Sequence, residues 1–197
     1  MLHRHRDTAA ARLPVSSDNN YSSTGLKKDI YLAAGCFWGA EHYFKQIRGV
    51  VATEAGYANG NIFHPTYEEV KTDCTGYAEA VHVIFDTEVI GLERILQLYF
   101  KAIDPLSVNR QGADSGIRYR TGIYYTDPAD LPSIHNIYDR VSGELKAPLA
   151  VEVKPLKNFY KAEEYHQDYL DKHPDGYCHI PKSLMEFART ASEVSND

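Results

Sequence analysis

Cysteine is scarce in this chain of 197 residues, and its three cysteines stand far apart at positions 36, 74 and 178. An odd number without regular spacing excludes the disulfide framework of a small secreted domain. Such cysteines suit a reducing compartment, where a disulfide forms only transiently and as part of a reaction. We therefore expect a cytoplasmic protein.

Metal-binding motifs are also missing, although nine histidines are available as ligands. The chain contains no CxxC, HxxxH or HExxH motif, and the pair His166 and His173 has no metal-ligand spacing. We expect no metal site.

Long apolar runs and an excess of positive charge are absent as well. No apolar stretch approaches the length of a membrane span, which argues against a transmembrane protein. Lysine and arginine number 21 against 27 acidic residues, a formal net charge of -6. This balance gives no general attraction to nucleic acid or to anionic lipid, so we expect neither as a partner.

The chain that remains has the composition of one ordinary globular domain. Hydrophobic residues make up 43% and charged residues 24%, without an internal repeat or an evident linker. Residues 1–28 differ, because they are polar, rich in serine and asparagine, and lack the apolar segment of a secretory signal. We expect a mostly disordered extension at 1–28 and a single domain at 29–197.

Apolar periodicity along that domain predicts alternating strands and helices. The segments expected as strands are 29–35, 50–58, 78–85, 119–125 and 151–155. The segments expected as helices are 40–47, 66–70, 91–103, 133–141, a polar stretch at 163–170, and a short last helix after a loop near 180. This order favours an α+β fold, a two-layer sandwich with a ferredoxin-like core and an irregular C-terminal segment, over a doubly wound parallel sheet.

Residues 35–39 read GCFWG and contain the only tryptophan. They follow a predicted strand and precede a predicted helix, so Cys36 falls at a strand-to-helix turn. Free backbone N–H groups and the positive end of the helix dipole favour a thiolate there. A lone cysteine is more often a small, buried and inert hydrophobe, so the surrounding residues must decide.

Six sequence blocks supply that context. They are GCFWGAE at 35–41, AGYANG at 55–60, PTYEEV at 65–70, TGYAEAV at 75–81, RQGADSGIRYRTGIYY at 110–125 and GYCHI at 176–180. Together, and in this order, they make the chain resemble the A-type peptide methionine sulfoxide reductases over roughly residues 29–180. The resemblance implies reduction of the S epimer of methionine sulfoxide in proteins, as repair of oxidative damage.

The resemblance assigns Cys36 as the nucleophile that attacks the sulfoxide sulfur and becomes a sulfenic acid. Phe37 and Trp38 match the aromatic residues that hold the substrate methyl group, whose burial is worth about 0.8 kcal/mol. Without the motif, an aromatic pair at the start of a helix would be read as ordinary core.

Four further residues match groups around the sulfoxide oxygen or the cysteine. Glu79 matches the acid, kept protonated by an apolar pocket, although a surface glutamate on an edge strand is the ordinary alternative. Tyr57 and Tyr119 match the hydroxyls that hold the oxygen, and each is otherwise a packing residue among fifteen tyrosines. Asp114 matches an aspartate near the cysteine, or is simply a turn former.

Cys178 matches the C-terminal cysteine that recycles the enzyme, in a segment whose glycine and proline residues let it reach Cys36. The resemblance implies a Cys36–Cys178 disulfide, which thioredoxin reduces from outside, with no cofactor. Cys74 matches nothing and is read as an inert loop side chain. The implied partners are thioredoxin and oxidised proteins or peptides, and we expect a monomer.

Two other function classes use the same residues. A thiol peroxidase or redox sensor would also need Cys36 and Cys178, but not a methyl pocket or two tyrosines converging with a glutamate. A non-enzymatic module that binds oxidised proteins would bind without turnover. The chain departs from many relatives at Tyr77, Ala113 and Arg118, which flank the chemical groups and bear on substrate preference.

Overall fold

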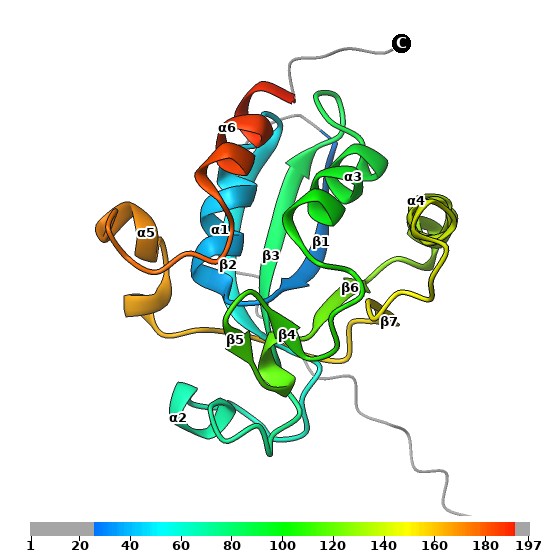
Figure 1. Ribbon diagram of the computed structural model, residues 1–197. Coiled ribbons are helices and arrows are strands. Elements are labelled where there is room, and N and C mark those ends of the chain that lie inside the picture. The colour runs from blue at the N-terminus through cyan, green and yellow to red at the C-terminus, as the bar shows by residue number, and fades with distance from the viewer. Residues whose placement is uncertain (1–25, 192–197) are drawn as a thin grey trace, which may run out of the picture.

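One six-stranded sheet organises the computed structural model, which describes residues 26–191 (Figure 1). Its strands are ordered β7-β6-β1-β3-β2-β8. They are β1 (Lys27–Ala34), β2 (Val50–Ala58), β3 (Ala78–Asp86), β6 (Thr121–Tyr125), β7 (Glu152–Pro155) and β8 (Phe159–Lys161). All neighbours pair antiparallel except β6 and β7. The central strands β6-β1-β3-β2 have the ferredoxin-like order, so the predicted fold class is confirmed.

The helices lie mainly on one side of this sheet. They are α1 (Phe37–Lys45), α2 (Tyr67–Val70), α3 (Leu92–Ala102), α4 (Leu131–Leu145), α5 (Tyr169–Lys172) and α6 (Lys182–Ala191). Figure 1 shows α1, α3 and α6 in front of the sheet, and α6 contacts both of the others. Helix α4 packs against α3 at the side of the sheet. Within residues 26–191, no helix is both long enough and apolar enough to cross a bilayer.

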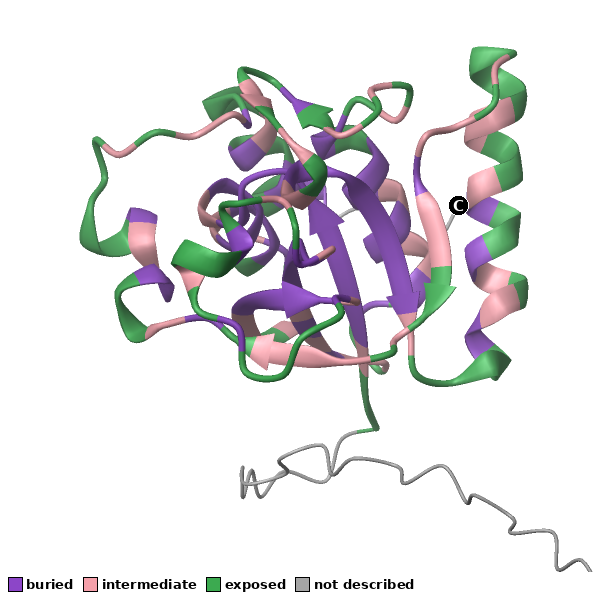
Figure 2. Cartoon of the chain, turned by 90° about the horizontal axis from the view of Figure 1, so that it is seen from below, coloured by how far each residue is buried: buried purple, intermediate pink, exposed green. Residues whose placement is uncertain are grey.

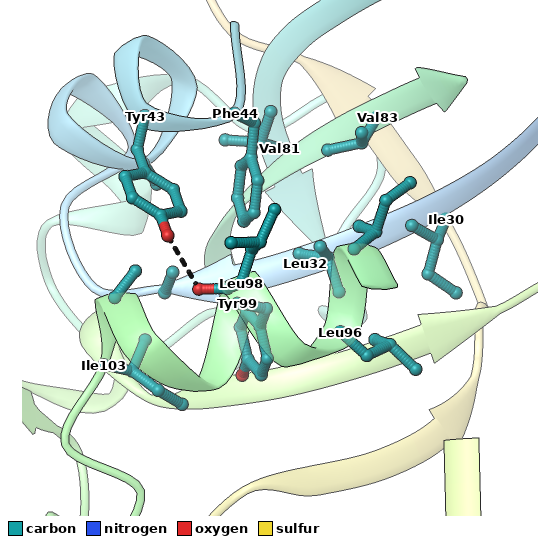
Figure 3. Close-up of a cluster of buried hydrophobic side chains, with 14 of the residues drawn as sticks. Ile30, Leu32, Tyr43, Phe44, Val81, Val83, Leu96, Leu98, Tyr99 and Ile103 are labelled. Atoms are coloured by element: carbon teal, nitrogen blue, oxygen red, sulfur yellow. Dashed lines mark hydrogen bonds between the residues drawn. The ribbon is translucent and has the colours of Figure 1, made fainter. Parts of the chain in front are cut away.

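The main core lies between the sheet and helices α1 and α3 (Figure 3). Side chains from β1 and β3, such as Leu32 and Val83, meet Phe44 of α1 and Leu96 of α3. The hydroxyl of Tyr43 donates a hydrogen bond of 2.9 Å to the carbonyl oxygen of Leu98, which joins the two helices. Figure 2 shows this buried interior as the purple centre of the molecule. Packing against the sheet and α3 therefore fixes the position of α1.

Alternation along β3 decides which of its side chains reach the helices. Val81 and Val83 point into the main core, while Ala80 lies in a second cluster on the opposite face. Glu79, two residues before Val81, therefore shares the helix-covered face. Its cross-strand neighbour on β2 is Tyr57. Because β3 lies between β1 and β2, Glu79 is on a central strand.

The prediction of one helix over residues 163–170 is wrong. This segment forms the 3₁₀ turn η3 (Glu164–His166), and α5 begins only at Tyr169. Between them, the side chain of Gln167 accepts a hydrogen bond from the Ala55 N–H and donates to two carbonyl oxygens. Asp168 has a left-handed backbone with φ 53°. The two bonds to Ala55 tie this segment to β2 and interrupt the helix, and a polar helical pattern gives no sign of them.

Other differences concern element ends and short elements. Strand β1 begins two residues earlier than expected, so Lys27 and Lys28 belong to the sheet rather than to the N-terminal extension. The rest of that extension, residues 1–25, lies outside the described residues. Strand β8 and the hairpin of β4 (Arg110–Gln111) and β5 (Asp114–Ser115) were not expected. Strands of two or three residues are too short to show a period.

Candidate active site

Cys36 occupies the turn between β1 and α1, as predicted, and is 7% exposed. The turn depends on Gly35, whose φ of +82° strains other residues and whose added Cβ would lie 2.6 Å from the Cβ of Gln111. Cys36 is the N-cap of α1, and the backbone N–H groups of Trp38 and Gly39 act on its sulfur by lowering the pKa of the thiol. The fold thus aims the free donors of a helix start at the thiol.

The charge state of Cys36 differs from the expectation. Burial, together with the carboxyl groups of Glu79 and Asp114, raises the pKa of Cys36 well above its ordinary value. The two backbone N–H groups act in the opposite direction and do not offset the burial. The N–H groups of the helix start favour the thiolate as expected, but burial outweighs them and the net shift favours the thiol.

Glu79 lies against the same turn and is 1% exposed. Its Oε2 accepts a hydrogen bond of 3.0 Å from the N–H of Phe37, the first residue of α1. Burial raises the pKa of Glu79 to about 8, although the Phe37 N–H and the charge of Arg118 oppose the shift. At neutral pH the carboxyl group is mostly protonated and can donate a proton. The alternative of a surface glutamate on an edge strand is wrong.

Tyr57 and Tyr119 both lie next to Glu79, whose charge contributes to raising the pKa of each. Burial is the largest cause, and it raises the pKa of Tyr119 to about 12. Both side chains are therefore neutral phenols at any physiological pH. The Tyr57 hydroxyl donates a hydrogen bond of 2.6 Å to Oε2 of Glu163, so its proton is already engaged.

Arg118 holds the other phenol in place. Its guanidinium lies 4.4 Å from the centre of the Tyr119 ring and forms an ion pair of 3.1 Å with Asp73. It also lowers the pKa of Glu79, against the effect of burial. Arg118 therefore acts both on the acid and on one of the two tyrosines beside it.

Phe37 and Trp38 play different structural parts. Phe37 is fully buried, with its ring centre 5.9 Å from that of Tyr57 and 5.0 Å from that of His166. Trp38 is half-buried and stacks on Tyr169 at 3.7 Å. Its indole N–H donates a hydrogen bond of 2.9 Å to Nδ1 of His166. The aromatic pair thus forms an apolar wall that continues into α5.

Three residues that line this site were not predicted from the sequence, namely Tyr67, Glu163 and His166. The Tyr67 ring packs edge-on against His166 at 4.4 Å, and the Tyr67 N–H donates to Glu163 at 2.8 Å. Burial and the charge of Glu79 raise the pKa of Tyr67. Glu163 and His166 were hidden because their segment was read as a polar helix. Tyr67 could have been predicted as a site residue, because it lies in the PTYEEV block that contributes to the family resemblance.

Asp114 lies in β5, at the edge of the site. It is half-buried, and its Oδ2 has no hydrogen-bond partner among residues 26–191. Its charge contributes to raising the pKa of Cys36, which places it near the thiol. It also belongs to the β4–β5 hairpin, so proximity to the cysteine and a part in the turn are compatible.

Cys178 lies against the first turn of α1. Its Sγ donates a hydrogen bond of 3.3 Å to the carbonyl oxygen of Ile180 and lies 2.9 Å from the point where a Cβ on Gly39 would be. Cys74 is exposed and donates to the carbonyl oxygen of Thr72 at 3.4 Å. All three cysteines are free thiols. The fold therefore sets Cys178 close to the helix turn that begins at Cys36.

Comparison with known proteins decides the family, because the family model described as peptide methionine sulfoxide reductase matches residues 28–196. The chain belongs to this family. The reductase from Lachnoclostridium phytofermentans is 53% identical over 166 residues, which cover 84% of this chain and 100% of that protein. The reductase from Clostridium acetobutylicum is 55% identical over 159 residues, covering 81% and 98%.

Solved structures of the family agree with this fold. Reduced Mxr1 from Saccharomyces cerevisiae has a TM-score of 0.77 and 35% identity, covering 85% of this chain and 97% of that chain. Methionine sulfoxide reductase A of Corynebacterium diphtheriae has a TM-score of 0.71 and 32% identity, covering 81% and 84%. This peptide methionine sulfoxide reductase is thus an oxidoreductase that acts on methionine sulfoxide. Within residues 26–191, no group of three or more His, Cys, Asp or Glu side chains could hold a metal ion.

Proposed function

We propose that this reductase acts on the S epimer of methionine sulfoxide in oxidised proteins and peptides, with Cys36 as nucleophile and Glu79 as acid. One observation supports this assignment above the others. The buried thiol at the N-cap of α1 shares its turn with a carboxyl group whose pKa burial raises to about 8. A nucleophile beside a protonated acid is the combination that sulfoxide reduction requires.

The substrate methyl group would lie against the aromatic wall next to the thiol. Phe37 forms its floor because it is fully buried, and the half-buried Trp38 forms a side that substrate can reach. Burial of one methyl group is worth about 0.8 kcal/mol, so the wall orients the sulfoxide more than it binds it. The polar oxygen is then directed toward Glu79 and the phenols of Tyr57 and Tyr119.

In the chemical step, the sulfur of Cys36 attacks the sulfoxide sulfur while Glu79 gives its proton to the sulfoxide oxygen. The substrate S–O bond breaks and the oxygen ends on Cys36 as a sulfenic acid. The thiol proton of Cys36 restores Glu79, and two electrons pass from the thiol sulfur to the substrate sulfur. One thiol and one sulfoxide thus give one sulfenic acid and one methionine.

Recycling would use Cys178, which attacks the sulfenic acid, releases water and forms a disulfide with Cys36. Thioredoxin would then reduce this disulfide by thiol exchange. The solved relative Mxr1 from Saccharomyces cerevisiae, 28% identical with a TM-score of 0.56, forms a complex with Trx2. We further propose a single reductase domain over residues 29–197, acting as a monomer in the cytoplasm without another cofactor.

A thioredoxin-coupled assay on the separate epimers of a blocked methionine sulfoxide tests this function. We expect the S epimer to be reduced to completion while the R epimer remains. Hydrogen peroxide serves as the control substrate, because a thiol peroxidase would consume it faster than either sulfoxide. Equal consumption of both epimers, or faster turnover of peroxide, would contradict the proposal.

Removing the two phenols should have unequal effects. Tyr57→Phe should lower the rate of the first turnover less than Tyr119→Phe, because the Tyr57 proton is already donated to Glu163. We expect each single loss to stay within about tenfold and the double variant to lose more than ~10²-fold. Rapid quenching of one turnover, with methionine as the measured product, gives these rates. A small effect in the double variant would remove both tyrosines from the site.

Cys178→Ser should still reduce one equivalent of sulfoxide per chain and then stop. Its Cys36 would remain a sulfenic acid, because no thiol next to α1 is left to attack it. A burst assay with thioredoxin as donor, followed by peptide mass analysis of the oxidised protein, checks this result. A Cys36–Cys74 bridge, or normal cycling by the variant, would assign recycling to Cys74 instead.

A further inference from the structure

His179, the residue after Cys178, lies over the turn that holds Cys36. Its Nε2 is 2.8 Å from the carbonyl oxygen of Ala34, the last residue of β1. A carbonyl oxygen only accepts hydrogen bonds, so Nε2 must carry a proton. In the neutral ring, the lone pair is then on Nδ1, the nitrogen nearer Gly39. The Ala34 contact therefore fixes the tautomer that leaves Nδ1 as a free base.

That nitrogen is unused by the fold. Nδ1 of His179 is buried and accepts no hydrogen bond from any group in the described part of the chain. Burial lowers the pKa of His179, while the Ala34 carbonyl and the charge of Asp114 oppose the shift. The ring is therefore neutral near pH 7. A buried acceptor without a donor costs stability, which a role in the reaction would explain.

Three glycines make room for this ring. A Cβ on Gly35 would lie 3.1 Å from Nε2, and one on Gly112 would lie 3.2 Å from the Cβ of His179. A Cβ on Gly39 would lie 3.3 Å from Nδ1 and 2.9 Å from Sγ of Cys178. The base and the thiol therefore both lie beside Gly39 on the first turn of α1, without a hydrogen bond between them in the reduced protein. The N–H of that same Gly39 also lowers the pKa of Cys36.

We propose that His179 is the general base of the recycling step, in which its Nδ1 takes the proton of the Cys178 thiol as that sulfur attacks the Cys36 sulfenic acid. The inference rests on the proposed function, since it needs Cys36 to be oxidised by substrate. The new S–S bond forms as the S–O bond of the sulfenic acid breaks. The proton held by His179 then joins the departing hydroxide, so one thiol and one sulfenic acid give a disulfide and one water.

The thiol needs such help because burial raises the pKa of Cys178. In the reduced protein its proton points to the carbonyl oxygen of Ile180, which cannot take it. Removing a base of this kind costs roughly 10²-fold in rate near neutral pH. The loss of rate caused by removing the base should shrink as pH rises toward the pKa of the Cys178 thiol, because the thiolate then forms without a base. The charge of Asp114 acts on the ring, and the Tyr177 hydroxyl lies beside it at Gly112.

A rapid-quench single turnover with the S epimer separates the two steps. Released methionine reports the first step, and peptide mass analysis of the Cys36–Cys178 disulfide reports the second. His179→Gln is the informative variant, since its amide can still donate to the Ala34 carbonyl but has no basic nitrogen. His179→Ala leaves space for added imidazole, and His135→Gln on the exposed face of α4 is the matched control.

We expect His179→Gln to release methionine at a rate within about threefold of the parent protein and to form the disulfide ~10²-fold more slowly at pH 7. Imidazole should speed disulfide formation in His179→Ala, and His135→Gln should behave as the parent does. Disulfide formation by His179→Gln at the parent rate would overturn the inference. So would a loss of methionine release in both His179→Gln and His179→Ala that imidazole does not restore. Failure of the parent protein to release methionine would instead contradict the proposed function.

Discussion

Replacing Cys36 with serine should abolish the reduction of methionine sulfoxide, a loss on the order of 10⁴-fold or more. A serine hydroxyl is a far poorer nucleophile than a thiolate and cannot pass through a sulfenic acid. The fold should survive, because Cys36 is the N-cap of α1 and serine is among the preferred N-cap residues. The lost activity would then report chemistry rather than unfolding.

The measurement is methionine formed in a single turnover, beside a thermal melt of the same preparation. Cys74→Ser is the matched control, since it makes the same change at an exposed loop position and should cycle normally. Substantial steady-state turnover by Cys36→Ser would contradict the assignment of Cys36 as the nucleophile. Loss of activity in Cys74→Ser would show that the loop cysteine takes part.

Replacing Glu79 with glutamine should slow the first turnover by ~10²-fold or more. Glutamine has almost the same shape, and its carbonyl oxygen can still accept the hydrogen bond from the Phe37 N–H. Its amide can donate a hydrogen bond to the sulfoxide oxygen but cannot deliver a proton. Glu41→Gln is the matched control, because Glu41 is also a buried glutamate but bonds Thr53 and the Asp168 N–H instead.

Glu79→Gln should have a second measurable effect, which is an increase in the reactivity of Cys36 rather than a loss. Above pH 8 the Glu79 carboxyl is mostly ionised, and its charge contributes to raising the pKa of Cys36. Removing that charge should lower the pKa of Cys36, so alkylation of Cys36 should begin at a lower pH in Glu79→Gln. Peptide-resolved alkylation with iodoacetamide measures this change.

A variant with a more reactive thiol and a slower reaction would separate proton donation from activation of the nucleophile. A first-turnover rate within about threefold of the parent would make the acid assignment wrong. Alkylation of Cys36 at an unchanged pH would show instead that the Glu79 charge does not reach the thiol.

Local sequence patterns were enough for the elements that frame the site. The strand-to-helix turn at Cys36 follows from apolar spacing on both of its sides, and alternation in β3 follows from Val81, Val83 and Phe85. These patterns succeed because backbone geometry repeats every two or 3.6 residues, so a few neighbours suffice. The ordered motifs gave the family for the same reason, since each is read along one short stretch.

Charge states and contacts between distant segments depended on the folded chain. The pKa of Cys36 is raised rather than lowered because burial exceeds the effect of two N–H groups, and only the packed structure fixes that burial. Glu79 is protonated because β3 is a central strand covered by helices. His166 reaches Trp38 across 128 positions of sequence, and His179 reaches Ala34 across 145. Desolvation and such contacts are properties of the assembled interior, to which residues far apart in sequence contribute together.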